Sequence, residues 1–143
     1  MAVEISGVVA LAFQLDNASA ALAATDTALA PVQGAGSVAQ FHAIQDGYVR
    51  GLNCEIEAAQ DLGDDVIFSV YVGGSRDADS EVTLSGLGSA GGATYGTQRF
   101  DRGDIPVSEG DAIIVEAKST DAVNCKPAGM VAVVYLQLGE SEI

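Results

Sequence analysis

Hydrophobic and polar residues alternate with a period of two along much of this chain, which is the pattern of half-buried β-strands. The alternation is clearest over residues 47–74, where it is interrupted only by the Asp- and Gly-containing segment 60–65. We therefore predict a pair of antiparallel strands here, joined by a hairpin or by a turn that carries the chain to a second sheet. The residues predicted to face inward are Leu52, Cys54, Ile56 and Ala58, then Val66, Phe68, Val70 and Val72.

The same alternation, punctuated by turn residues, predicts several further strands. The Ala-rich segment 18–30 is followed by Pro31 and is predicted to be a loop or short strand, with a helix of one or two turns as the alternative. The segment 86–96 holds too many glycines to pack regularly and is predicted to be a surface loop. The additional predicted strands are 1–15, 38–44, 81–85, 95–101, 112–118 and 130–138.

These short strands predict an all-β fold, a jelly-roll-like antiparallel β-sandwich that forms a single domain. The 143 residues are 48% hydrophobic but only 6% aromatic, so the core is expected to be thin and built from small side chains. Within residues 1–143 we distinguish N-terminal strands with a candidate docking arm, 1–46, the jelly-roll core, 47–138, and a short polar tail, 139–143.

The last predicted strand is apolar on both of its faces. Ala132, Val134, Leu136 and Leu138 share one parity, and Val131, Val133 and Tyr135 share the other. A sandwich buries only one face of each sheet, so the second set is expected to touch a neighbouring subunit. Val131, Val133 and Tyr135 are therefore the candidate subunit interface.

The charge balance excludes one class of partner. Twenty acidic residues against six basic ones give a formal charge of −14, which repels nucleic-acid phosphates. Such a surface fits either simple solubility, including life in a salty medium, or docking on a basic partner. The N-terminal apolar run has no preceding basic residue and is too short to span a bilayer, so we expect synthesis in the cytoplasm and no membrane partner.

No residue pattern predicts catalysis or a cofactor. His42 is the only histidine and lies on the polar parity of a predicted strand, where a solvated or hydrogen-bonded side chain is expected. Cys54 and Cys125 lack a CxxC spacing, and buried free thiols are favoured over a bridge. A hydrolase is disfavoured because there is no Trp and there are only four Tyr to stack on a substrate.

Three other motifs are interpreted as turns. Asp77, Asp79 and Glu81 alternate as in a calcium loop but lack its Gly and distal Glu, so solvated acids are favoured over divalent-ion binding. Asp61, Asp64 and Asp65 form a second acidic turn of the same kind. The Arg102-Gly103-Asp104 tripeptide is expected to be a turn that joins two strands.

The glycine cluster 86–92 lacks the Lys-Ser or Lys-Thr of a phosphate-binding loop, so it does not predict nucleotide binding.

Four segments of the chain resemble the small jelly-roll modules of tailed bacteriophages. They are GYVRGL at 47–52, FSVYVGG at 68–74, VSEGD at 107–111 and YLQL at 135–138, so the resemblance extends over about 47–138. Those modules share the trimeric sandwich plan of tumour-necrosis-factor-like and collagen-tail head domains. Stand-alone modules resemble capsid decoration, or cement, proteins, whereas fused ones occur in fibres. The chain has no collagen-like repeat or heptads, which favours decoration.

The resemblance implies a homotrimer that binds the major capsid protein on the outer face of an icosahedral phage head and stabilises it. It also implies a structural virion protein on the capsid surface, made in the host cytoplasm, with no enzymatic activity. The candidate capsid-docking surface is the N-terminal arm 1–14 or the neighbouring segment 18–30, with 86–96 as the rival. Ala18, Leu22 and Leu29 are the candidate docking residues. One alternative is a fibre or collar tip that binds a host glycan or protein, and another is a non-viral surface-layer or spore-coat component.

Overall fold

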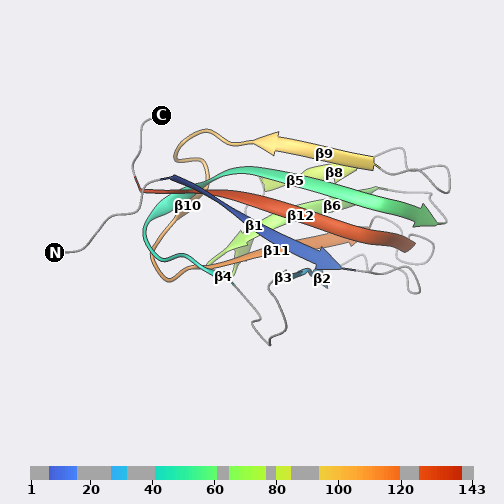
Figure 1. Ribbon diagram of the computed structural model, residues 1–143, viewed down its shortest axis with the longest axis horizontal. Helices are drawn as coiled ribbons and strands as arrows, with labels where there is room; N and C mark the ends of the chain where they lie inside the picture. The colour runs from blue at the N-terminus through green and yellow to red at the C-terminus, as the bar shows by residue number, and fades with distance from the viewer. Residues whose placement is uncertain are drawn as a thin grey trace.

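The protein is a sandwich of two antiparallel sheets, without an α-helix in the part described (Figure 1). This fold is seen in a computed structural model. The predicted fold class, an all-β jelly-roll-like antiparallel sandwich, is confirmed. The structure describes residues 7–15, 27–31, 41–60, 65–76, 80–84, 94–119 and 126–139.

We name the two sheets by their positions in Figure 1, where one lies in front of the other. In the described residues the front sheet runs in the order β10-β5-β12-β1-β3, and β9 also pairs with β5. Its strands are β1 (Gly7–Leu15), β3 (Ala30–Pro31), β5 (Gly47–Gln60), β9 (Thr94–Arg99), β10 (Pro106–Val107) and β12 (Lys126–Leu138).

The back sheet runs in the order β2-β11-β6-β7 over the described residues, with β4 also pairing with β11 and β8 with β6. Its strands are β2 (Thr27–Ala28), β4 (Phe41–His42), β6 (Val66–Val72), β7 (Ser75–Arg76), β8 (Val82–Leu84) and β11 (Ala112–Ser119).

The strands β5 and β6 do not form a hairpin with each other. β5 pairs with β12 and β9 in the front sheet, while β6 pairs with β11 in the back sheet. The connection after β5 therefore switches sheets, which was the second of the two alternatives drawn from the sequence. The predicted inward faces are confirmed at six of the eight positions, where both strands turn their apolar parity into the space between the sheets. Val72 is half-buried and packs against the core, and the side chain of Ala58 lies outside the described part of the structure. The buried residues are Leu52, Cys54 and Ile56 on β5, and Val66, Phe68 and Val70 on β6.

A tight hairpin follows β6. Gly73 and Gly74 have φ of +60° and +85°, as a two-residue turn with the hand of the sheet twist requires. Ser75 and Arg76 therefore belong to strand β7 and not to the turn, since Val72 already pairs with Ser75. The chain then pairs with β6 again as β8, whose Val82 and Leu84 are buried.

Both sheets contribute to one core of small and medium side chains. Phe13 of β1 packs edge-to-face on Phe41 of β4, with ring centroids 5.4 Å apart, and so joins the two sheets. β11 alternates as predicted, with Ile113, Val115 and Ala117 fully buried. On β12, Ala132, Val134, Leu136 and Leu138 are buried, which confirms their predicted inward parity.

The strand bounds differ from the predicted ones at several places. β12 begins at Lys126 and is longer than predicted, and β9 begins at Thr94, inside the segment predicted to be a glycine-rich loop. Two short strands, β2 and β3, lie in and beside 27–30, which favours the short-strand alternative there. Residues 1–6, 18–26, 38–40, 85–93 and 140–143 of the predicted segments lie outside the described residues.

The connections at the left-hand end of Figure 1 are tied together by Asp46. Its Oδ1 accepts a 2.8 Å hydrogen bond from the Glu109 amide, and its carbonyl accepts one from the Gly139 amide at 3.0 Å. Pro106, which has no amide hydrogen to donate, begins β10 beside β5. This end is therefore held by hydrogen bonds that join residues distant in sequence.

Candidate functional site

The outward face of the front sheet carries a patch of apolar side chains, which we call the outer stripe. Val131 and Tyr135 are 39% and 37% exposed, large fractions for side chains of their kind in the middle of a sheet. Cross-strand pairing sets Ala10 opposite Tyr135 and Ala12 opposite Val133, so the patch is continuous across two strands. The outer stripe consists of Val8, Ala10 and Ala12 on β1 and Val131, Val133 and Tyr135 on β12.

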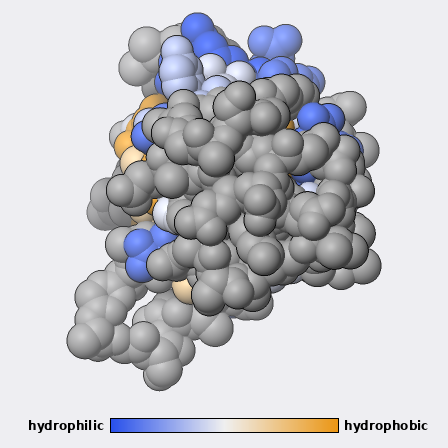
Figure 2. All heavy atoms as spheres, turned by 90° about the vertical axis from the view of Figure 1, so that its right-hand side faces the viewer, coloured by the Kyte–Doolittle hydropathy of each residue, from blue (hydrophilic) through white to orange (hydrophobic). Residues whose placement is uncertain are grey.

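The outer stripe ends at a polar flank on β5. Val133 pairs with Asn53 and Val131 with Glu55, and beyond them Asn53 pairs with Thr97 of β9. Figure 2, which shows the right-hand end of Figure 1, has hydrophobic residues along its left margin, on the side of the front sheet. Hydrophilic residues gather at the top of that view, on the side of β9. The apolar patch is thus bounded by polar residues, as an association surface is.

The candidate interface residues therefore lie where the sequence pattern predicts, on the outer parity of β12. Val131 and Tyr135 are exposed and Val133 is half-buried. Their contact with a neighbouring subunit stays a prediction.

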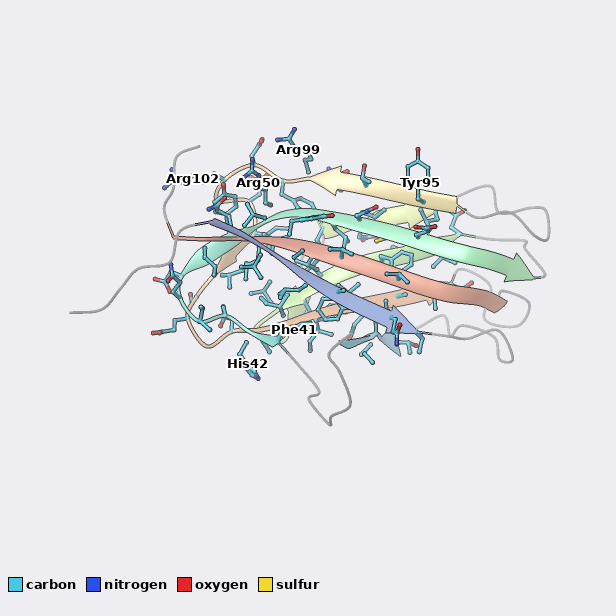
Figure 3. The ribbon with its side chains drawn as sticks, in the orientation of Figure 1. Phe41, His42, Arg50, Tyr95, Arg99 and Arg102 are labelled. Carbon is cyan, nitrogen blue, oxygen red and sulfur yellow. The ribbon has the colours of Figure 1, made fainter. Side chains whose placement is uncertain are left out.

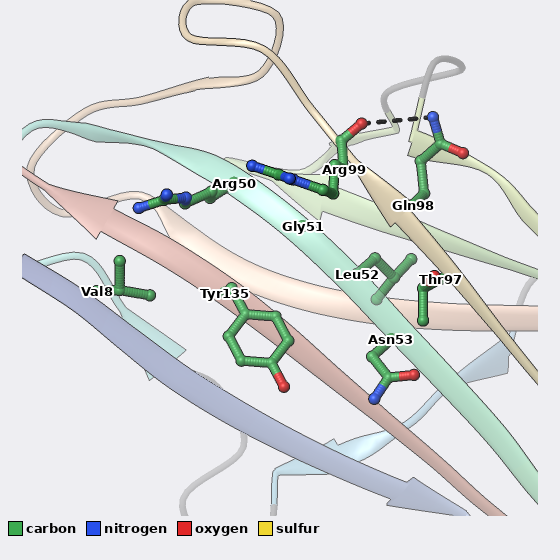
Figure 4. A pocket seen from close by; sticks show the side chains of 9 residues that line it. All are labelled: Val8, Arg50, Gly51, Leu52, Asn53, Thr97, Gln98, Arg99 and Tyr135. Atoms are coloured by element: carbon green, nitrogen blue, oxygen red, sulfur yellow. Dashed lines mark hydrogen bonds between the residues drawn. The ribbon is translucent and has the colours of Figure 1, made fainter. Parts of the chain in front are cut away.

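A pocket of about 390 Å³ lies at one end of the outer stripe (Figure 4). It spans strands β1, β12, β5 and β9, so residues distant in sequence line it. Figure 4 shows the side chains of Arg50 and Arg99 along one side of the pocket, with Tyr135 and Val8 opposite them. Its principal lining residues are Val8, Arg50, Asn53, Thr97, Arg99 and Tyr135.

The floor of the pocket depends on a glycine. Gly51 pairs with Tyr135 on one side and with Arg99 on the other. A Cβ added to Gly51 would lie 3.2 Å from the carbonyl oxygen of Gln98 and 3.8 Å from Cδ2 of Tyr135. A side chain at this position would therefore occupy part of the space that now forms the pocket.

A β-bulge brings Arg50 to the pocket. The register of β12 and β5 shifts between Tyr135 and Leu136, which pair with Gly51 and Val49 respectively. Arg50 is the extra residue on β5, so its side chain escapes the inward parity that strict alternation from Leu52 would give it. Its carbonyl accepts a hydrogen bond from the Phe100 amide at 2.9 Å, where β9 ends.

Gln137 holds the Arg50 side chain in place. Arg50 Nη1 donates a 3.3 Å hydrogen bond to Gln137 Oε1. Gln137 is 4% exposed, and its Nε2 donates to the carbonyl oxygens of Gly7 and Leu138 at 3.2 and 3.1 Å. The buried amide is therefore fixed by two backbone acceptors, and it presents its oxygen to the guanidinium.

A third arginine stands at the same corner of the molecule, outside the pocket (Figure 3). Arg102 belongs to the exposed turn 101–104, in which the Asp104 amide bonds to the Asp101 carbonyl at 3.1 Å and Gly103 has φ of +88°. The tripeptide from Arg102 is thus a turn between β9 and β10, as predicted. Three of the six basic residues of an acidic chain gather here.

The predicted capsid-docking residues are not seen as an exposed set. Leu29 is 2% exposed and its amide donates to the Val115 carbonyl at 2.9 Å, so its prediction as a docking residue is wrong. The physical reason is that the chain here enters the core between β2 and β3, which an Ala-rich pattern does not reveal. Ala18 and Leu22 lie outside the described residues.

The other side chains that were considered for catalysis or metal binding do not line the pocket. His42 is exposed and its Nδ1 lies 3.1 Å from the Gly110 carbonyl, to which it donates, as predicted for a hydrogen-bonded surface histidine. Cys54 is a free, buried thiol, and burial raises its pKa. Cys125 lies outside the described residues, as do Asp61, Asp64, Asp77 and Asp79.

Two features are absent from the described residues. No group of three or more His, Cys, Asp or Glu residues there could hold a metal ion. No helix in the same part of the chain has the length and apolar character needed to cross a membrane.

Neither a family model nor a curated protein matches the chain. Among solved structures it is similar to the globular domain of zebrafish complement 1qA protein, with 10% identity and a TM-score of 0.47 over 92% of this chain and 98% of that one. It is similar to the PRD1 vertex protein P5, with 12% identity and a TM-score of 0.38 over 91% and 96%. The Podospora anserina GH26-CBM35 β-(1,4)-mannanase is similar with 10% identity and a TM-score of 0.32, over 93% of this chain and 29% of that one. At these TM-scores the similarities identify neither a function nor a subunit arrangement.

The pocket was not predicted from the sequence. Arg50 and Arg99 are 49 positions apart and come together only because β5 pairs with β9. Strict alternation from Leu52 assigns Arg50 to the inner face, but a charged arginine without a partner is not expected in an apolar core. That conflict, next to a glycine, is the signal of a bulge that the sequence does contain.

Proposed function

We propose that this chain is a structural virion protein, a homotrimeric decoration protein that binds the outer face of an icosahedral phage head and stabilises it. The observation that carries the proposal is the outer stripe, because an isolated subunit would leave it in water. Association of three copies through this face would bury it without a coiled coil or a collagen-like repeat, neither of which the sequence contains.

The stabilising action would be mechanical. Sites for the protein that exist only on the expanded head would be occupied by mass action, and each bound copy would lower the free energy of that state. A trimer would bind through three identical patches at once, so weak individual contacts with the major capsid protein would add up to tight attachment. This function requires neither a cofactor nor a catalytic residue.

Attachment to the capsid is proposed for the segment around Ala18 and Leu22. The burial of Leu29 and the pairing of β2 with β11 limit how this is tested. Deleting 18–30 would remove a core side chain and a strand, so the variant would lose stability for reasons unrelated to docking. A Gly-Ser replacement of 18–24 alone keeps Thr27–Ala28 and Leu29 in place.

The proposal is tested by mixing the purified protein with expanded heads of candidate phages that lack their decoration protein. We expect co-sedimentation and regularly placed surface knobs in negative-stain images. The 18–24 replacement should keep its oligomeric mass and lose capsid binding, while a shortened 86–92 segment should keep both. Knobs that persist with the first variant and vanish with the second would transfer the docking site to the glycine-rich segment.

The fibre-tip alternative predicts exposed aromatic residues gathered at one end of the domain. Tyr95 is 74% exposed, and its cross-strand partner on β5 is Glu55, which does not line the pocket. The partner of Tyr135 on β5 is Gly51. The two rings thus lie four residues apart along β5, and the described residues do not favour this alternative.

A further inference from the structure

The pocket beside the outer stripe concentrates positive charge on a strongly acidic protein. The chain has six basic and twenty acidic residues, and two of the six, Arg50 and Arg99, line this one pocket. Within the described residues neither arginine forms an ion pair with a carboxylate, and the side-chain contact of Arg50 is with the neutral amide of Gln137. An anionic group is therefore the complementary occupant.

Arg50 is arranged to bind such a group at low entropic cost. Gln137 is buried and fixed by two backbone carbonyls, and it holds one nitrogen of the guanidinium. A guanidinium carries five N–H donors in a planar fork, so further donors remain for a carboxylate, which it can bind through two parallel hydrogen bonds. Arg99 adds a second charge from the neighbouring strand β9, opposite Gly51.

Tyr135 connects the pocket to the outer stripe. Its side chain is the last apolar member of the stripe on β12 and also one wall of the pocket. A partner that covers the stripe therefore passes directly beside both arginines. Tyr and Arg are among the residue types enriched at the positions that dominate the binding energy of protein interfaces.

We infer that this pocket receives a carboxylate group of a second copy of this chain when the outer stripe is covered. The inference rests on the proposed homotrimer and adds an electrostatic contact between subunits to the apolar contact of the outer stripe. A second copy bears twenty acidic side chains, so the surface it brings to the pocket is rich in carboxylates. Copies with a net charge of −14 repel one another, and the arginine pair supplies attraction where they meet.

Salt acts on this contact in two opposite ways. It screens the general repulsion between the copies, which favours association, and it screens the local arginine–carboxylate attraction, which opposes it. The salt dependence of the wild-type protein alone is therefore not diagnostic. The difference between wild type and a pocket variant isolates the local attraction, and this difference should shrink as salt is added.

The test compares sedimentation equilibrium of wild type, Arg50→Gln, Arg99→Gln and the double variant at about 0.05 and 0.5 M NaCl. Arg102→Gln is the matched control, since it removes the same charge from the same corner outside the pocket. We expect the association midpoint of the double variant to rise at least about tenfold at low salt and less than about threefold at high salt. The control should stay within about threefold of wild type throughout.

If the pocket variants behave as Arg102→Gln does while wild type associates, the inference is overturned and the homotrimer stands. If wild type is monomeric at every concentration and salt level, both fail. The two failures are thus distinguished in one series of measurements.

A second measurement identifies the source of the carboxylate. The Arg99→Lys variant places an amine at the pocket, which a carbodiimide can condense with a carboxylate in contact with it. We expect an inter-chain amide, seen as a covalent dimer whose cross-linked peptide contains position 99, and no such peptide from wild type. A cross-link confined to one chain, or the absence of an inter-chain product with strong binding of citrate instead, would contradict a second copy as the occupant.

Discussion

The ring of Tyr135 lies beside the bare backbone of Gly51, its direct partner across strands β12 and β5. A Cβ at position 51 would be 3.8 Å from Tyr135 Cδ2, which is ordinary van der Waals contact. The absence of a side chain at Gly51 leaves the hollow between Tyr135 and Arg99, and the bulge at Arg50 adds the second charge to it. One cross-strand pair thus joins the apolar patch to the charged pocket.

Replacing Ser80 by Ala should destabilise the fold. Ser80 is fully buried, and its Oγ accepts a hydrogen bond from the Val70 amide at 2.9 Å and donates to the Val70 carbonyl at 3.3 Å. The variant leaves both backbone groups without these bonds in a dry environment, at a cost of about 1–3 kcal/mol. Urea denaturation measures the change. Thr83→Ala, at an exposed position of the adjacent strand β8, should change stability by less than about 0.5 kcal/mol.

Gly96 is expected to tolerate no side chain without loss of stability. A Cβ there would lie 2.8 Å from Leu84 Cδ2 and 2.9 Å from Val82 Cγ1, both on buried side chains of β8. Gly96→Ala should therefore cost about 1–3 kcal/mol through overpacking of the two sheets. Thr97→Ala on the same strand is the exposed control. Equal urea midpoints for the two variants would show that β9 and β8 leave room for a side chain at position 96, which contradicts the close packing described here.

Stability should fall at high pH because of Cys54. Burial raises the pKa of this thiol, so it keeps its proton in the folded state, whereas an exposed thiol loses it above about pH 8.5. The folded state then binds more protons than the unfolded state. The free energy of unfolding should therefore decrease as pH rises, by about 1.4 kcal/mol per pH unit above that value from this group.

The Cys54→Ala variant separates this effect from other titrations. It should lose about 1–2 kcal/mol at neutral pH because a buried sulfur is removed. Its free energy of unfolding should then fall less steeply than that of wild type above about pH 8.5. Parallel pH profiles in urea denaturation would mean that Cys54 ionises in the folded protein as easily as in the unfolded chain.

The faces of the strands were predictable from the sequence, but the partners were not. Alternation fixes which side of a strand is buried, and this held for β6, β11 and β12 because the sandwich has one continuous core. It contains no information on whether Leu52 and Val66 belong to one sheet or to two. The switch between sheets depends on long-range pairing with β12 and β11, which local residue patterns do not encode.

The candidate site was predictable in part for a related reason. The outward parity of Val131, Val133 and Tyr135 follows from local alternation. The pocket instead requires the bulge at Arg50 and the pairing of Gly51 with Arg99, which arise from register. Leu29 was misassigned because an isolated apolar residue in an Ala-rich segment carries no periodic signal to show that it enters the core.

The Val133→Asp change tests the outer stripe as an association surface. Asp at this position puts a charge in the middle of the apolar patch, where its desolvation on association is costly without a partner. Because Val133 is only half-buried in the single chain, the subunit should stay folded, with an unchanged circular dichroism spectrum. Thr83→Asp adds the same charge at an exposed position of the back sheet and is the matched control.

The central claim is tested most directly by the mass of the protein in solution, measured by light scattering at micromolar concentration. If the outer stripe is a subunit contact, wild type and Thr83→Asp should both have the mass of a trimer, three times the chain mass of 14.5 kDa. Val133→Asp is expected at the mass of a single folded chain. A wild type of 14.5 kDa, or a Val133→Asp variant that keeps the trimer mass, would contradict the claim.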